Sequence, residues 1–281
     1  MKLLKKMAIV VIFCAVLTGI IFFIKDKHDN NIENTYINYV NDILIPKYGK
    51  SSLYLENNNN PSIEGEKLLD KDSEGILFYK IIDLDESSNQ NLLVLRSSIK
   101  HDLEYEGSIS TELIYDIYTI DDNKVKQIKF NKNKFYLLGD FLKNPQKNKT
   151  EYSLFTIKNQ SQNYFCSNYI SISNIKDNIY FDLKIFNSDK NNNSINLDYE
   201  LSPEIDLSSY AKYNFRILQF DKDSDLIFKN KTDLKNKCIS NTKKYGLDNL
   251  VKSIFDDAGN KTFTDISKLN NIDKIISIKI K

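Results

Sequence analysis

Short apolar runs separated by polar clusters dominate this chain of 281 residues. Residues 76–82 and 92–95 are apolar at both alternating positions. This pattern predicts two inner strands that are covered on both faces and joined as a hairpin. Other aromatic and β-branched runs predict further strands at 113–120, 125–130, 135–138, 152–157, 164–172, 213–220, 226–228 and 275–280.

The clearest hairpin lies in the second half of the chain. Residues 179–185 alternate apolar and more polar side chains, and the alternation resumes at 195–201 after the Asn-rich tip at 191–193. One dry face and one mostly wet face are typical of an antiparallel sheet that is packed on one side. A second tight turn is predicted at 121–123, because Asp and Asn tolerate a left-handed backbone.

Two segments have the spacing of an amphipathic helix, with every apolar side chain on one face. The first comprises Tyr36, Tyr39, Val40, Ile43 and Leu44, and the second comprises Leu247, Leu250, Val251, Ile254 and Phe255. Pro46 and Gly49 are expected to end the first helix, and Gly259 the second. Residues 50–74 are polar and predict a loop.

These elements predict an α+β fold: an antiparallel sheet or sandwich with two amphipathic helices, preceded by one transmembrane helix. The folded domain is expected at 35–281, with a possible subdomain boundary near Pro203. We find no repeat of 20 to 50 residues, which argues against a propeller or a solenoid.

Residues 7–24 carry no charge over 18 positions, a length suited to a helix that crosses the hydrocarbon core of a membrane. Three lysines within residues 1–6 predict a cytoplasmic start by the positive-inside rule, with the following domain extracytoplasmic. A cleaved signal peptide usually has a shorter apolar region that ends in small residues. We therefore favour an uncleaved signal anchor, followed by a polar spacer at 25–34.

Two other interpretations of this segment remain open. Cys14 invites lipidation, but the bulky Phe13 precedes it where a small residue is expected. A buried core helix normally has a polar face, and residues 7–24 have none. The membrane is therefore the one partner that the sequence predicts, and the ligand remains open.

The overall charge of +1 conceals an asymmetry. The first 27 residues hold five lysines and Asp26, so that the remainder has 34 basic and 37 acidic residues. A slightly acidic domain lacks the basic field that binding to nucleic acid requires. This argues against nucleic acid as a partner.

The loop between the two inner strands carries oxygen-bearing side chains at alternate positions: Asp83, Asp85, Ser87 and Asn89. Residues 83–92 resemble the Asp-x-Asp-x-Asp-Gly-x-x-Glu-Leu loop of anchored or secreted, mostly uncharacterised proteins of Gram-positive bacteria, and the calcium loops of FG-GAP and VCBS repeats. Here Ser87, Ser88 and Asn91 replace the third acid, the glycine and the glutamate. The resemblance implies location and architecture more than activity.

Calcium is the cofactor that this loop type implies. Calcium binds six to eight hard oxygens around a turn that normally needs glycine, whereas this loop offers two carboxylates and no glycine. A hairpin tip held by Asx-type hydrogen bonds is the alternative. A second acidic run, Asp221, Asp223 and Asp225, is another candidate metal site, with a solvated acidic tip as its alternative.

Cys166 and Cys238 are the only cysteines outside residues 7–24. Outside the cytoplasm they could form one disulfide across a long loop. Two reduced, buried thiols are the other interpretation. Neither cysteine has a histidine in a recognisable catalytic relation to it.

No catalytic motif is present: the chain lacks a Gly-x-Ser-x-Gly elbow, a His-Glu-x-x-His pair and a glycine-rich phosphate loop. The sequence therefore predicts a membrane-anchored, extracytoplasmic protein that binds to or stabilises the cell envelope without catalysis. The alternatives are a hydrolase of envelope polymers that uses a carboxylate pair and a calcium-stabilised, adhesin-like module.

Overall fold

The protein is known from a computed structural model. It describes residues 31–55, 62–64, 67–68, 70–84, 90–101, 109–130, 133–138, 148–159, 162–173, 178–189, 193–206, 213–219, 222–228, 231–259, 264–269 and 271–280. The chain divides into two compact units, Met1–Lys47 and Tyr48–Lys281. None of the described helices is long and apolar enough to cross a membrane. The predicted span at 7–24 lies outside the described residues.

The first predicted helix is confirmed, although it does not end at Pro46. Residues 31–39 are helical and continue through the π-helical turn η1 (Val40–Leu44) into α2 (Ile45–Tyr48). In η1 the Ile45 N–H donates to the Val40 carbonyl, five residues earlier. A proline ring clashes with the carbonyl four residues before it, and a wider turn gives that ring room. The helix ends instead at Gly49, whose φ is +81°.

The smaller sheet has six strands among the described residues, in the order β1-β3-β4-β5-β6, with β8 also paired to β5. Its strands are β1 (Lys50–Leu55), β3 (Gly75–Asp83), β4 (Gln90–His101), β5 (Ile109–Asp121), β6 (Lys124–Gln127) and β8 (Lys134–Leu138). The prediction that β3 and β4 are inner, antiparallel strands is confirmed. The turn between β5 and β6 is also confirmed, with Asp122 and Asn123 at φ of 50° and 58°.

The larger sheet has nine described strands, in the order β14-β13-β12-β11-β10-β9-β15-β2, with β7 paired to β12. They are β2 (Ser62–Glu64), β7 (Lys129–Phe130), β9 (Asn148–Asn159), β10 (Gln162–Ser173), β11 (Asn178–Asp189), β12 (Ser194–Asp206), β13 (Tyr213–Gln219), β14 (Lys222–Phe228) and β15 (Ile272–Ile280). The predicted hairpin is β11–β12. Pro203 lies inside β12, in register with Phe215 of β13.

The predicted α+β fold with antiparallel sheets is wrong: the chain is mostly β, and both sheets are mixed. Three pairs of strands are parallel, namely β1–β3, β2–β15 and β7–β12. Residues 50–55 and 62–64 form strands in a region predicted to be a loop. These strands are short and pair with distant segments, so no local apolar pattern marks them.

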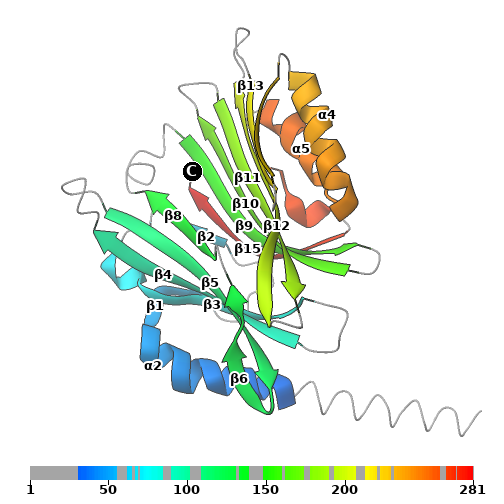
Figure 1. Ribbon diagram of the computed structural model, residues 1–281. Coiled ribbons are helices and arrows are strands. Elements are labelled where there is room, and N and C mark those ends of the chain that lie inside the picture. The colour runs from blue at the N-terminus through cyan, green and yellow to red at the C-terminus, as the bar shows by residue number, and fades with distance from the viewer. Residues whose placement is uncertain are drawn as a thin grey trace, which may run out of the picture. The chain divides into compact units, whose positions relative to one another are not determined.

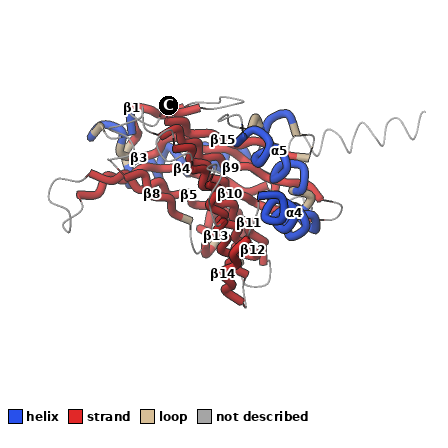
Figure 2. Tube along the Cα trace, turned by 90° about the horizontal axis from the view of Figure 1, so that it is seen from above, coloured by secondary structure: helices blue, strands red, loops and turns tan. Residues whose placement is uncertain are grey.

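The short 3₁₀ helix η3 (Lys71–Ser73) lies beside β1 and β4 of the smaller sheet. The helices between β14 and β15 cover one face of the larger sheet (Figures 1 and 2). They are α4 (Lys231–Thr242), α5 (Asp248–Gly259) and the short 3₁₀ turns η4 (Lys243–Tyr245) and η5 (Ile266–Lys268). The second predicted helix corresponds to α5. The five apolar residues that predicted it are all buried, with Leu247 just before α5 and the other four within it. Helix α4 was not predicted, because only Leu234 and Cys238 are buried apolar side chains on it.

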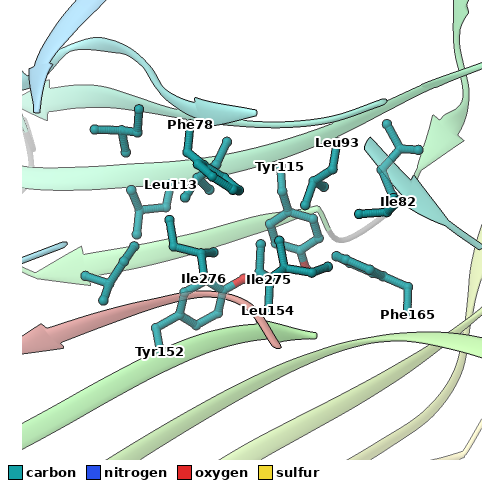
Figure 3. Close-up of a cluster of buried hydrophobic side chains, with 14 of the residues drawn as sticks. Phe78, Ile82, Leu93, Leu113, Tyr115, Tyr152, Leu154, Phe165, Ile275 and Ile276 are labelled. Carbon is teal, nitrogen blue, oxygen red and sulfur yellow. The ribbon is translucent and has the colours of Figure 1, made fainter. Parts of the chain in front are cut away.

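The other face of the larger sheet packs on the smaller sheet. Figure 3 shows Phe78, Leu93 and Leu113 from one sheet against Tyr152, Leu154 and Ile276 from the other. Aromatic rings continue this layer: the centroid of Phe130 lies 5.3 Å from that of Tyr115 and 4.9 Å from that of Phe186. Edge contacts of this kind stabilise a core beyond simple burial.

A buried carboxylate joins the strands on the opposite face of the smaller sheet. Asp116 of β5 is 2% exposed and accepts a hydrogen bond of 2.9 Å from Arg96 Nε. Its other oxygen accepts bonds of 3.0 Å from the side-chain amides of Gln127 and Asn133. The Arg96 guanidinium also lies 4.4 Å from the ring centroid of Tyr48. The chain has only two arginines, and the planar group suits this combined stacking and pairing.

Replacing Arg96 by Lys should lower the free energy of unfolding by roughly 1–3 kcal/mol, because an ammonium cannot stack on Tyr48 while it bonds Asp116. Urea unfolding followed by circular dichroism measures this. Lys126→Arg, at an exposed ion pair with Asp121, is the matched control and should change nothing. An Arg96→Lys protein as stable as wild type would show that simple charge is sufficient.

Polar side chains form one buried row on the helix-covered face of the larger sheet. Asn168, Ser153 and Ser277 lie directly opposite one another on β10, β9 and β15. All are at most 2% exposed. Within the described part of the chain, Asn168 Oδ1 and Ser277 Oγ have no hydrogen-bond partner. A buried polar atom without a partner lowers the free energy of unfolding, because it loses its hydrogen bonds to water on folding and gains none in the protein.

Ser277→Ala should therefore leave the free energy of unfolding unchanged or raise it by about 1 kcal/mol. Ser97→Ala is the matched control, since its buried hydroxyl donates to the Ser73 carbonyl, and it should lower stability. Thermal unfolding of both variants makes the comparison. A loss from Ser277→Ala as large as that from Ser97→Ala would reveal a partner for the Ser277 hydroxyl.

Candidate functional site

Polar and aromatic side chains gather on the larger sheet, on the same face as the packed layer between the sheets. Along β10 that face runs from buried Phe165 to Tyr169, and along β11 it runs from buried Phe186 to Tyr180, by the alternation of a strand. We define the tyrosine–carboxylate face as Tyr169, Tyr180, Asp182, Lys184, Glu200 and Ser202. These residues come from β10, β11 and β12.

An irregularity in β12 sets the alignment of this face. The ladder between β11 and β12 pairs Ile185 with Tyr199 but Phe186 with Leu197, which leaves Asp198 as an extra residue. A β-bulge of this kind re-aims side chains. Asp198 accepts a bond of 2.6 Å from the Tyr245 hydroxyl on the helix side, while Glu200 lies directly opposite Lys184.

Lys184 lies between two carboxylates. Its Nζ is 2.9 Å from Asp182 Oδ2 and 3.5 Å from Glu200 Oε1. The three side chains are between 9% and 20% exposed. Burial by itself lowers the pKa of Lys184, but the charge and hydrogen bond of Asp182, together with the charge of Glu200, outweigh it and raise that pKa. The lysine therefore remains protonated, and one lysine between two acidic residues gives the triad a formal charge of −1.

Ser202 fixes the position of the Asp182 carboxylate. Its hydroxyl donates a bond of 2.8 Å to Asp182 Oδ1, while Lys184 contacts Oδ2. Both carboxylate oxygens are therefore held before any ligand arrives. Each oxygen retains a further lone pair for another donor.

Two tyrosines flank the charged triad. The ring centroids of Tyr169 and Tyr180 are 5.9 Å apart, and the rings are inclined by 59°. Tyr180 is 38% exposed; the only other exposed large apolar side chain in the described part of the chain is Ile43. Burial, followed by the charge of Asp182, raises the pKa of Tyr180. Its hydroxyl therefore stays protonated at neutral pH.

The inner end of the face continues into the layer between the sheets. Ser167 lies directly opposite Lys184 and hydrogen-bonds to the Tyr115 hydroxyl. Burial raises the pKa of Tyr115 to about 12, although its bond with Ser167 and the charge of Lys184 oppose this. Figure 3 shows Tyr115 and Tyr152 among the apolar side chains of the two sheets. Ser167 and Tyr115 thus connect the tyrosine–carboxylate face with the buried layer between the sheets.

The residues predicted to bind calcium are not brought together by the described structure. Asp83 is exposed at the end of β3, in register with Gln90, and Asp85, Ser87 and Asn89 lie outside the described residues. Asp223 and Asp225 lie on β14, and Asp221 is outside the described range. Asp225 is in register with Arg216 of β13. No group of three metal-binding side chains occurs within the described ranges.

The two cysteines lie in one hydrophobic cluster between the larger sheet and the helices. Cys166 of β10 and Cys238 of α4 are both free thiols and fully buried. Burial raises the pKa of both thiols. Protonated, buried thiols are poor nucleophiles and behave as small apolar side chains.

Sequence reasoning did not single out Asp182, Lys184 or Glu200. The signal that could have found them is the polar face of the predicted hairpin, where charged residues alternate with apolar ones. The prediction that this hairpin is packed on one side only is wrong, because Phe186 and Ile195 on its polar face pack against the smaller sheet. Comparison with protein-family models, with curated proteins and with solved structures finds no match. The resemblance at 83–92 stays a prediction, and function has to be argued from geometry.

Replacing Lys184 by Met should lower the free energy of unfolding by roughly 2–4 kcal/mol at neutral pH, because two largely buried carboxylates lose their shared cation. Urea unfolding measures the loss. Lys126→Met removes a wholly exposed ion pair and should leave the midpoint unchanged. Equal effects from the two variants would contradict a structural role for the triad.

Wild type and Lys184→Met also test how the contribution of Lys184 to the free energy of unfolding depends on pH. The folded-state pKa of Lys184 is raised above its ordinary value of 10.5. Its contribution to stability is therefore fully present below about pH 10.5 and is lost as the pH rises through the higher folded-state pKa. The stability difference between wild type and Lys184→Met should stay constant from pH 7 to 10 and shrink at higher pH. A difference that already disappears by pH 9 would contradict the assignment.

Proposed function

We propose that this protein is a membrane-anchored, extracytoplasmic module of the bacterial cell envelope that binds a ligand on the tyrosine–carboxylate face and catalyses no reaction. The observation that carries this proposal is the exposed ring of Tyr180 beside a fixed polar triad. Aromatic side chains next to a few well-placed polar groups are characteristic of binding sites. The apolar segment at 7–24 supports the anchor.

The arrangement of the two acids supports binding rather than hydrolysis. Hydrolases that use a carboxylate pair leave the space between the carboxyl groups for the scissile bond and a water molecule. Here Lys184 Nζ contacts both Asp182 and Glu200 and occupies that space. A hydrolase of envelope polymers is the second candidate, because two largely buried carboxylates do converge on one face.

Incubating the full chain with purified cell walls separates the two candidates. Binding without catalysis predicts no release of soluble sugar or new reducing ends over many hours. Heat-inactivated protein is the blank. Release by wild type that both Asp182→Asn and Glu200→Gln abolish would overturn the proposal and establish the hydrolase.

The anchor has its own test. Protease added to intact cells should digest the domain beyond residue 34, and detergent extraction should be needed to release the undigested protein. A cytoplasmic enzyme monitored in the same cells reports lysis. Full protection of the domain in unlysed cells would reverse the proposed orientation.

A further inference from the structure

We propose that the ligand of the tyrosine–carboxylate face is a pyranose unit of a glycan that bears no anionic groups at the point of contact, with Tyr180 stacking on the sugar. This inference rests on the proposed binding function and specifies the class of ligand. It is carried by the exposure of one ring, the fixed acceptors beside it and the charge of the face.

The first step is the Tyr180 ring itself. A pyranose presents C–H groups on its two faces and hydroxyls around its edge, so it suits an aromatic ring bordered by hydrogen-bonding groups. Tyr180 provides such a ring at 38% exposure. Exposed rings next to polar groups contribute strongly to recognition.

The second step is the set of acceptors. Sugar hydroxyls are donors, and the Asp182 carboxylate, 15% exposed and two residues from Tyr180 on the same face of β11, offers acceptor oxygens. Lys184 and Ser202 hold Asp182 in position before binding. A site ordered in advance avoids the entropy loss of ordering its side chains on binding.

The third step is the charge. The triad of Lys184, Asp182 and Glu200 has a formal charge of −1. Phosphate-rich or otherwise anionic polymers would therefore meet like charge, which disfavours them.

The ring geometry limits how a glycan can bind. Tyr169 and Tyr180 are inclined by 59° with centroids 5.9 Å apart, so together they form a corner and not a flat platform. A corner contacts the face and edge of a single sugar, whereas a flat row of rings follows successive units of a chain. The site therefore recognises an individual unit within a polymer.

The test is co-sedimentation of the full chain, in detergent micelles, with two insoluble probes. One is cell-wall glycan from a Gram-positive bacterium after acid removal of its anionic polymers, and the other is the same wall with those polymers retained. Wild type should bind the stripped wall at least as well as the unstripped wall. Tyr180→Ala should weaken binding to the stripped wall about tenfold or more, while Tyr180→Phe should retain most of it.

Ile43→Ala is the matched control, because Ile43 is the other exposed large apolar side chain described, at 50%. It should bind as wild type does, and thermal unfolding of Tyr180→Ala should match wild type. Equal binding by Tyr180→Ala, or binding that requires the anionic polymers, would overturn the assigned ligand class and leave the binding function intact. A wild-type protein that sediments with neither wall would contradict the proposed function itself.

Discussion

Four aromatic rings packed between the two sheets hold the mostly β unit together. Tyr115 comes from the smaller sheet, Phe165 and Phe186 from the larger one, and Phe130 from β7, which lies between them in the chain. Each of the three fully buried rings, Tyr115, Phe165 and Phe186, contributes about 2–3 kcal/mol by removal from water. Phe130 is partly buried and contributes less, and the edge contacts add to the total. Because β6 pairs in one sheet and β7 in the other, this cluster also fixes where the chain passes between sheets.

The candidate site depends on this packing through the alternation of β10 and β11. The same sheet face that presents Phe165 and Phe186 to the smaller sheet presents Tyr169 and Lys184 further along. The bulge at Asp198 then brings Glu200 opposite Lys184. A rigid hydrophobic layer is thus continuous with a polar surface, which allows charged side chains to keep fixed positions without a loop or a metal to hold them.

Local patterns predicted those parts of the fold in which neighbouring residues carry the information. The doubly apolar strands β3 and β4, the β11–β12 hairpin and helix α5 all follow from periodicity, and Asp122 and Asn123 form the expected turn. Helix α4 was missed because it buries only a narrow stripe around Leu234 and Cys238. Strands β1 and β2 were missed because parallel partners distant in sequence define them. For the site, periodicity identified the wet face of the hairpin, but pairing across β11 and β12 was needed to join Asp182, Lys184 and Glu200.

The position of β15 constrains the order of folding. Residues 272–280 pair between β9 and β2, more than 100 residues after β9 in the chain. Until β15 has been synthesised, one edge of β9 has no strand beside it, and Ile276 and Ile278 cannot complete the layer between the sheets. Contacts between residues this far apart in sequence slow folding, and they prolong the exposure of unpaired strand edges that can aggregate. A chain without this strand therefore exposes an unpaired edge of β9 and an incomplete apolar layer, both of which promote aggregation.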